Sequence, residues 1–166
     1  MLSGKCIIDA LKTSGIRYIL SVPDIVTSDG LLWPVSRDPD FRLVRVCKED
    51  EAVSIAAGLS FGGVRSLVLI QNTGFMDSIN AIRVMAVEYN LPICLMVGLQ
   101  GLEPGRLPAE SGKYSVRICP PLADVMELGN HLIRNDDDIP VISGEIERAY
   151  AAPGPVAFFL GRSPAA

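Results

Sequence analysis

The feature that most constrains the fold is a series of short, nearly continuous apolar runs separated by segments of helical length. The runs expected to form strands are residues 18–22, 43–47, 66–70, 93–97, 116–118 and 156–160. Strands that are apolar on both faces are typical of a parallel sheet covered by helices on both sides. The sequence therefore predicts an α/β fold, with a mostly parallel sheet of about six strands flanked by helices on both faces, as in flavodoxin-like proteins.

The segments between these runs carry apolar residues at spacings of three and four, as amphipathic helices do. They predict helices over residues 4–14, 50–61, 76–89, 122–133 and 141–151. Residues 98–113 contain four glycines and two prolines without periodicity, which indicates a long loop of the kind that is often functional or mobile. We expect an acidic turn at residues 136–138 and a frayed tail at residues 161–166.

Length and composition narrow the range of functions. With 166 residues the chain is long enough for one domain with a substantial core, so we expect a single domain over residues 1–166. Because 49% of the residues are hydrophobic and only 20% are charged, some apolar surface is expected in a subunit interface. A net charge of −4 without a dense lysine and arginine cluster argues against nucleic-acid binding. No apolar run is long enough for a membrane span and no signal-peptide pattern opens the chain, so we expect a cytoplasmic protein.

The cysteines and the single histidine argue against several kinds of site. Cys6, Cys47, Cys94 and Cys119 are scattered and lack the C-x-x-C pairing of a metal or redox site. We interpret them as small buried residues in a reducing compartment. His131 is the only histidine, which excludes a multi-histidine metal centre, and we expect it on a helix surface or in the core.

Polar residues follow three of the expected strands directly. Asp24 comes after the first strand, residues 48–50 after the second and residues 71–74 after the third. Ligands of parallel α/β sheets bind at the carboxyl ends of the strands. The residues alone therefore predict a carboxylate-rich site at one edge of the sheet.

Three motifs at these places identify a resemblance. They read EDEAVSIAAG from residue 49, with nine positions separating Glu49 from Gly58, QNTGFMDSIN from residue 71, and VPD from residue 22. From residue 4 to residue 160 the chain resembles the pyrimidine-binding domains of the thiamine diphosphate-dependent decarboxylase superfamily. The resemblance is strongest to the alpha subunits of sulfopyruvate decarboxylases and the matching half of phosphonopyruvate decarboxylases.

The resemblance implies a catalytic and cofactor-binding role for Glu49. In the family a glutamate at this position contacts the aminopyrimidine ring of thiamine diphosphate. Its short hydrogen bond favours the imino tautomer, whose exocyclic nitrogen removes the thiazolium proton. The neighbouring Glu51 has the wrong spacing to Gly58. The alternative for Glu49 is an ordinary acidic residue in the first turn of a helix, favoured there by the helix dipole.

The other two motifs imply further site residues. By position in the family, Gln71, Asn72, Thr73 and Gly74 line the cofactor near a subunit interface. The alternative is a polar loop that caps the following helix. Asp24 is implied as a second catalytic residue on the substrate side, a polar anchor or proton carrier, with a turn-forming role as the alternative.

The chain departs from its relatives at two places. Asp50 follows the glutamate, and the segment at residues 98–101 lacks the arginine that close relatives tend to carry before the corresponding glycine. That arginine would suit a sulfonate or phosphonate group. Arg106 or Lys113 in the same loop could replace it, although a solvated loop charge explains either residue equally well.

The Gly-Asp-Gly motif, which in this family holds the diphosphate through Mg²⁺, is missing from the sequence. The resemblance therefore implies a hetero-oligomer with a beta subunit that carries this motif and the Mg²⁺. The implied reaction converts sulfopyruvate to sulfoacetaldehyde and carbon dioxide. Alternatives are decarboxylation of phosphonopyruvate or another 2-oxo acid, carboligation, or a non-catalytic binding module. A flavodoxin-like nucleotide-binding protein would need a glycine-rich phosphate-binding loop after the first strand, and the sequence has none there.

Overall fold

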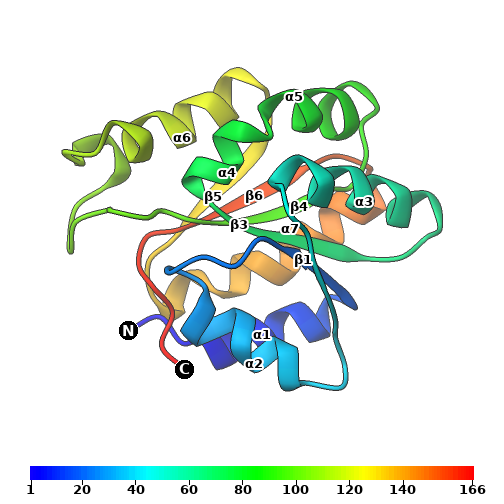
Figure 1. Cartoon of the computed structure of the whole chain (residues 1–166), viewed down its shortest axis with the longest axis horizontal. Coiled ribbons are helices and arrows are strands. Elements are labelled where there is room, and N and C mark those ends of the chain that lie inside the picture. Colours follow the sequence, from blue (N-terminus) through cyan, green and yellow to red (C-terminus); the bar gives the residue numbers. More distant parts are fainter.

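A computed structural model describes all 166 residues and contains one six-stranded sheet with helices on both faces (Figure 1). The strands are β1 (Tyr18–Ser21), β2 (Arg42–Arg45), β3 (Ser66–Gln71), β4 (Cys94–Gly98), β5 (Gly129–Ile133) and β6 (Val156–Leu160). Their order in the sheet is β2-β1-β3-β4-β6-β5, and every neighbouring pair is parallel. The predicted fold class is confirmed.

The helices connect successive strands. They are α1 (Gly4–Thr13), the π-helix η1 (Ser28–Leu32), α2 (Trp33–Arg37), α3 (Glu49–Phe61), α4 (Asn72–Asp77), α5 (Ile79–Ala81), the π-helix η2 (Ile82–Glu88), the 3₁₀-helices η3 (Pro108–Glu110) and η4 (Asp136–Asp138), α6 (Tyr114–Val125) and α7 (Pro140–Ala151). No helix has both the length and the apolar character needed to cross a membrane.

Two hydrophobic cores lie on opposite faces of the sheet. Along β3, Leu67 and Leu69 point into the core shared with α1, α2 and α7, whereas Val68 and Ile70 point into the core shared with α3, α4, η2 and α6. The two sets of helices lie below and above the sheet in Figure 1. Because successive side chains in a strand alternate between faces, burial on both sides requires the continuous apolar runs seen in the sequence.

The segment after the long loop corrects two predictions. The strand expected at residues 116–118 is the first half of α6, and the helix expected at residues 122–133 covers only the end of α6 before β5 begins. The prolines Pro120 and Pro121 lie inside α6 rather than ahead of a helix. Proline inside a helix costs about 3 kcal/mol, and packing of the apolar face of α6 on the sheet offsets that cost.

β5 escaped prediction because it is an edge strand. Four of its five residues are only partly buried, and Asn130 and His131 lie within it. His131 therefore lies on a strand, where its ring stacks on Phe158 and its Nε2 is 3.4 Å from a carboxylate oxygen of Glu145. The predicted place of His131 on a helix is wrong.

The helix expected at residues 76–89 starts earlier and is interrupted. In the Gln-Asn-Thr-Gly segment, expected as a loop, Gln71 ends β3 and the other three residues form the first turn of α4; the helical path continues through α5 and η2. The short helices η1 and α2 between β1 and β2 were not predicted at all. Their residues lack the repeated apolar spacing of a longer helix.

The cysteine prediction is half right. Cys94 and Cys119 are buried, and burial raises the pKa of both thiols to about 12. Cys6 and Cys47 are exposed, which contradicts the prediction. Cys6 lies on the exposed side of α1. Cys47 follows β2, which is half-exposed because it is an edge strand of the sheet.

The tail at residues 161–166 is not frayed as expected. Ala165 pairs with the start of the chain: its N–H donates to the carbonyl of Leu2 at 2.8 Å, and its carbonyl accepts from the N–H of Gly4 at 2.7 Å. The two ends of the chain therefore lie side by side (Figure 1).

Candidate functional site

The carboxyl ends of β1, β3 and β4 are linked by the segment that follows β1. A Cβ on Gly98, the last residue of β4, would lie only 2.8 Å from Cβ of Val26 and 3.2 Å from Cγ2 of Thr27. Since β3 lies between β1 and β4, this segment must cross the end of β3 to reach Gly98. The segment that follows β1 therefore covers the carboxyl end of β3.

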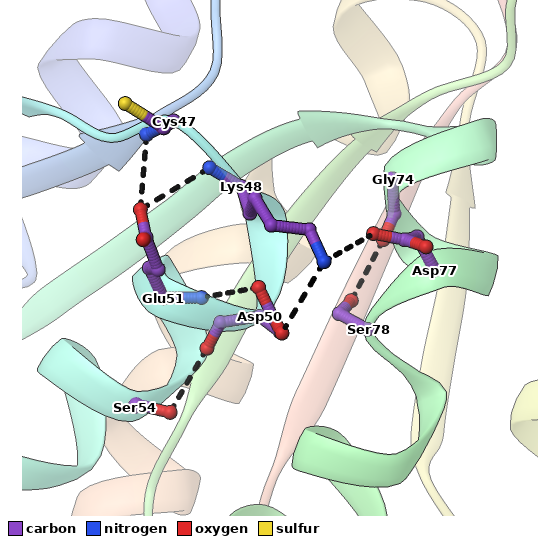
Figure 2. Close-up of polar contacts among 8 residues, drawn as sticks. All are labelled: Cys47, Lys48, Asp50, Glu51, Ser54, Gly74, Asp77 and Ser78. Carbon is purple, nitrogen blue, oxygen red and sulfur yellow. Dashed lines mark hydrogen bonds and ion pairs between the residues drawn. The ribbon is translucent and has the colours of Figure 1, made fainter.

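Two of the three acidic residues that open α3 are engaged within the helix (Figure 2). An oxygen of Glu51 accepts from the backbone N–H groups of Cys47 at 3.0 Å and Lys48 at 3.2 Å. The carboxylate of Asp50 accepts from the backbone N–H of Glu51 at 2.9 Å. Glu51 thus caps the helix, since it satisfies donors that otherwise have no partner there.

Glu49 is the acidic residue that remains without a partner. Its side chain is partly buried at the first position of α3, yet it forms no hydrogen bond and no ion pair within the chain. The carboxyl group lies directly over the Cα of Gly74. A Cβ on Gly74 would come within 2.3 Å of Oε1 and 2.4 Å of Cδ of Glu49. Any side chain at position 74 would displace this carboxylate, so the glycine permits the close approach.

Contacts around Gly74 fix α4 on the sheet. The hydroxyl of Ser78 donates to the carbonyl of Gly74 at 2.8 Å (Figure 2). The fully buried Phe75 packs edge-on against Phe159, with 5.6 Å between the ring centroids. Lys48 Nζ lies 3.9 Å from the carboxylate oxygens of both Asp50 and Asp77. These ion pairs are half exposed and contribute little, so the burial of Phe75 dominates. Sequence reasoning missed all these supports.

The residues before Gly74 divide into two kinds. Asn72 is buried, and its amide donates to Ser115 Oγ and accepts from the N–H of Gln100, both at 3.2 Å, so it ties α4 to α6 and to the loop after β4. The Oε1 atom of Gln71 is buried without any hydrogen-bond partner. Thr73 is exposed. A buried acceptor without a donor costs about 1–3 kcal/mol, which marks Gln71 as an acceptor that a ligand could satisfy.

Asp24 uses both carboxylate oxygens inside its own turn. Oδ1 accepts from the N–H groups of Val26 at 2.7 Å and Thr27 at 2.9 Å, and Oδ2 accepts from the hydroxyl of Thr27 at 2.5 Å. The residue is buried. The turn-forming alternative thus accounts for every hydrogen bond of this carboxylate.

The long loop after β4 is held by internal contacts. Glu103 accepts from the Ser111 hydroxyl at 2.7 Å and from the N–H of Gly112 at 2.9 Å, and the Ser111 hydrogen bond is the main reason that its pKa falls to about 2. Arg106 donates to the carbonyl of Glu110, and the stem of Lys113 packs over Gly101. Neither cation forms an ion pair with an acidic side chain.

Two acceptors at the carboxyl edge of the sheet are therefore unengaged, the Glu49 carboxylate next to Gly74 and the carbonyl oxygen of Gln71 at the end of β3. A carboxyl group placed like this can hold a hydrogen bond to a nitrogen heterocycle that reaches the edge from outside. No three histidine, cysteine, aspartate or glutamate side chains gather closely enough to hold a metal ion.

Comparison with known proteins reveals similarity to enzyme subunits. The chain is 33% identical over 104 residues to the sulfopyruvate decarboxylase subunit alpha of Methanocaldococcus jannaschii, and 32% identical over 101 residues to that of Methanothermobacter thermautotrophicus. These alignments cover 63% and 61% of this chain. The chain spans about three fifths of the length of both relatives, 61% in each case. The resemblance indicated by the motifs is confirmed.

A longer protein matches more of the chain at lower identity. The phosphonopyruvate decarboxylase of Streptomyces viridochromogenes is 25% identical over 152 residues, which is 92% of this chain and 36% of that protein. No family model matches the sequence.

The different engagement of Glu49 and Glu51 predicts different effects on stability. Glu51→Ala removes the cap of α3 and should lower the free energy of unfolding by about 1–2 kcal/mol. Glu49→Ala removes no hydrogen bond or ion pair within the chain and should change the free energy of unfolding by less than about 0.5 kcal/mol. Urea unfolding of the full chain measures both variants. Equal losses in the two variants would show that Glu49 serves the fold and not a ligand.

Proposed function

We propose that this chain is the pyrimidine-binding alpha subunit of a thiamine diphosphate-dependent 2-oxo acid decarboxylase, a carboxy-lyase. Residues 1–166 form its single pyrimidine-binding domain. The substrate is sulfopyruvate, which yields sulfoacetaldehyde and carbon dioxide. Support comes from the three motifs at the sheet edge and from the names of the relatives in Methanocaldococcus and Methanothermobacter.

The observation that carries the proposal is the unpartnered carboxyl group of Glu49 over Gly74. An aminopyrimidine ring offers one nitrogen for a hydrogen bond from Glu49 and an exocyclic amino group that can donate to Gln71 Oε1, the buried acceptor without a partner. Glu49 and Gln71 therefore fit the aminopyrimidine ring of thiamine diphosphate. Thr73 lines the same turn of α4, whereas Asn72 acts by positioning that turn through Ser115 and Gln100.

In the mechanism, Glu49 holds a proton at the pyrimidine ring nitrogen, while Gly74 leaves room for its carboxyl group to reach that atom. Asp24 fixes the turn that crosses the end of β3 and so shields this edge from water. When bound, thiamine diphosphate supplies the carbon nucleophile for the 2-oxo group and accepts the electron pair left by carbon dioxide.

A beta subunit carrying a Gly-Asp-Gly motif and Mg²⁺ is the proposed partner, because this chain has no such motif for the diphosphate. The contact surface we assign to it is the outer face of α3. Ser54, Ile55, Gly58 and Phe61 follow each other there at helical spacing, and Phe61 is 76% exposed. A Cβ on Gly58 would meet nothing within 4 Å, so a neighbouring helix can approach closely. This face begins one turn from Glu49.

Phosphonopyruvate is the second candidate substrate, and one observation favours it. The Streptomyces protein of that name aligns with 92% of this chain, a larger share than the sulfopyruvate decarboxylase subunits cover. Carboligation by the same site is a third possibility for the reaction. A non-catalytic module would not need the unengaged Glu49.

Carbon dioxide release tests the reaction. The chain is co-expressed with a beta subunit from a neighbouring reading frame and supplied with thiamine diphosphate, Mg²⁺ and sulfopyruvate, phosphonopyruvate or pyruvate. We expect turnover only with both chains, and fastest with sulfopyruvate. Glu49→Gln should lower kcat by about 10²–10⁴-fold, because proton transfer is lost.

Glu127→Gln is the matched control, since Glu127 is exposed and makes no side-chain contact; its turnover should equal that of the unsubstituted complex. Full activity of Glu49→Gln would contradict the role in proton transfer that we assign to Glu49. No release from any of the three acids by a stable complex would favour carboligation or a non-catalytic module.

The assigned contact surface has its own test. Phe61→Asp places a charge in the apolar face of α3 and should abolish co-purification with the beta subunit, because burying an unpaired carboxylate is costly. The control is Val125→Asp, at an equally exposed apolar residue at the end of α6. Co-purification that survives Phe61→Asp, or is lost equally with Val125→Asp, would contradict this surface.

A further inference from the structure

A second polar cavity lies at the carboxyl edge of the sheet, away from Glu49. Its volume is about 220 Å³, and it opens between the loop after β4 and the segments that follow β5 and β6. The lining residues are Gly105, Arg106, Leu107, Arg134, Asn135, Gly161 and Arg162. Three arginines from three separate segments thus surround one cavity, and no acidic side chain lines it.

The arginines are poorly neutralised within the chain. Arg162 forms no hydrogen bond or ion pair, and Arg106 donates only to the backbone carbonyl of Glu110 at 3.0 Å. The Nε atom of Arg134 lies 3.9 Å from Asp138, but the same carboxylate oxygen already accepts from the N–H of Arg134 at 2.7 Å and from that of Asn135 at 3.3 Å. Most guanidinium donors therefore remain available.

Two acidic residues of the loop after β4 are also engaged. The carboxylate of Glu110 accepts from the N–H of Leu107 at 3.0 Å, and Glu103 is held by Ser111 and Gly112. Neither forms an ion pair with an arginine of the cavity. Guanidinium groups that share a cavity repel one another unless an anion lies between them.

Glycines shape the cavity. The stem of Arg134 lies across Gly161, where a Cβ would be 3.0 Å from its Cγ. Gly105 has a φ of +80°, a conformation that other residues rarely adopt, and it leads directly into Arg106. Asn135 accepts from the N–H of Asp137 through Oδ1, which leaves its amide NH₂ as a further donor.

We propose that this cavity binds a small ligand through an oxyanion group, a phosphate, sulfate or sulfonate. The planar guanidinium fork matches such groups with paired hydrogen bonds, and carboxyl ends of parallel strands are where ligands of these sheets bind. β4 separates β3, which precedes Gly74, from β6. At about 4.8 Å per strand the ends of β3 and β6 are roughly 10 Å apart. The proposal does not depend on the decarboxylase assignment.

Isothermal titration calorimetry of the full chain tests the site with sodium phosphate, sodium sulfate and methanesulfonate, at an ionic strength kept constant with sodium chloride. We expect saturable binding of one anion per chain and competition among the three probes. Arg162→Gln and Arg134→Gln should each weaken binding about tenfold, because each removes charge-assisted hydrogen bonds. The stronger of phosphate and methanesulfonate identifies the head group of the natural ligand.

Arg17→Gln is the matched control, at an exposed arginine without side-chain partners on the opposite edge of the sheet; it should leave binding unchanged. Amide NMR shifts of Gly105 and Gly161 on phosphate addition give a local readout that does not require a variant. Titrations without saturation, equal weakening by Arg17→Gln, or unmoved signals of both glycines would overturn the proposal.

Discussion

The site depends on one close contact, the approach of the Glu49 carboxyl group to the Cα of Gly74. That approach requires α3 and α4 to begin side by side at the carboxyl edge of the sheet. The Glu51 cap fixes where α3 begins, and the hydroxyl of Ser78 together with buried Phe75 fixes α4. Each support leaves Glu49 itself unengaged. The buried Oε1 atom of Gln71 near the same edge has no donor, and such an atom is costly for folding alone, which is why it indicates a ligand.

The sheet supplies the rigid frame for this contact. Its four central strands, β1, β3, β4 and β6, are buried on both faces, so a shift of one of them by one residue would move its side chains into the opposite core, and the register is strongly fixed. The same burial made the fold predictable, since it demands continuous apolar runs. The spacing from Glu49 to Gly58 predicts Glu49 and not Glu51 as the site residue, and in the structure Glu51 is engaged as a cap whereas Glu49 forms no hydrogen bond within the chain.

Other parts could not be predicted, for physical reasons. β5 is an edge strand with Asn130 and His131 and lacks an apolar run, while α6 contains Pro120 and Pro121 and is stabilised by packing on the sheet. Within the site, the residue type of Gly74 matched a motif, but the reason for it is a collision that only the three-dimensional arrangement reveals. The arginines around the second cavity come from three distant segments, so no spacing rule connects them.

The central claim is that Glu49 controls a proton on the pyrimidine ring of the cofactor. The most direct measurement is the rate at which the thiazolium C2 proton of thiamine diphosphate exchanges with deuterium in the complex of both chains, read by quenched-flow proton NMR. The account predicts that Glu49→Gln slows this exchange by about 10²–10⁴-fold, while Glu127→Gln leaves it unchanged. An equal exchange rate in Glu49→Gln and in the unsubstituted complex would contradict it.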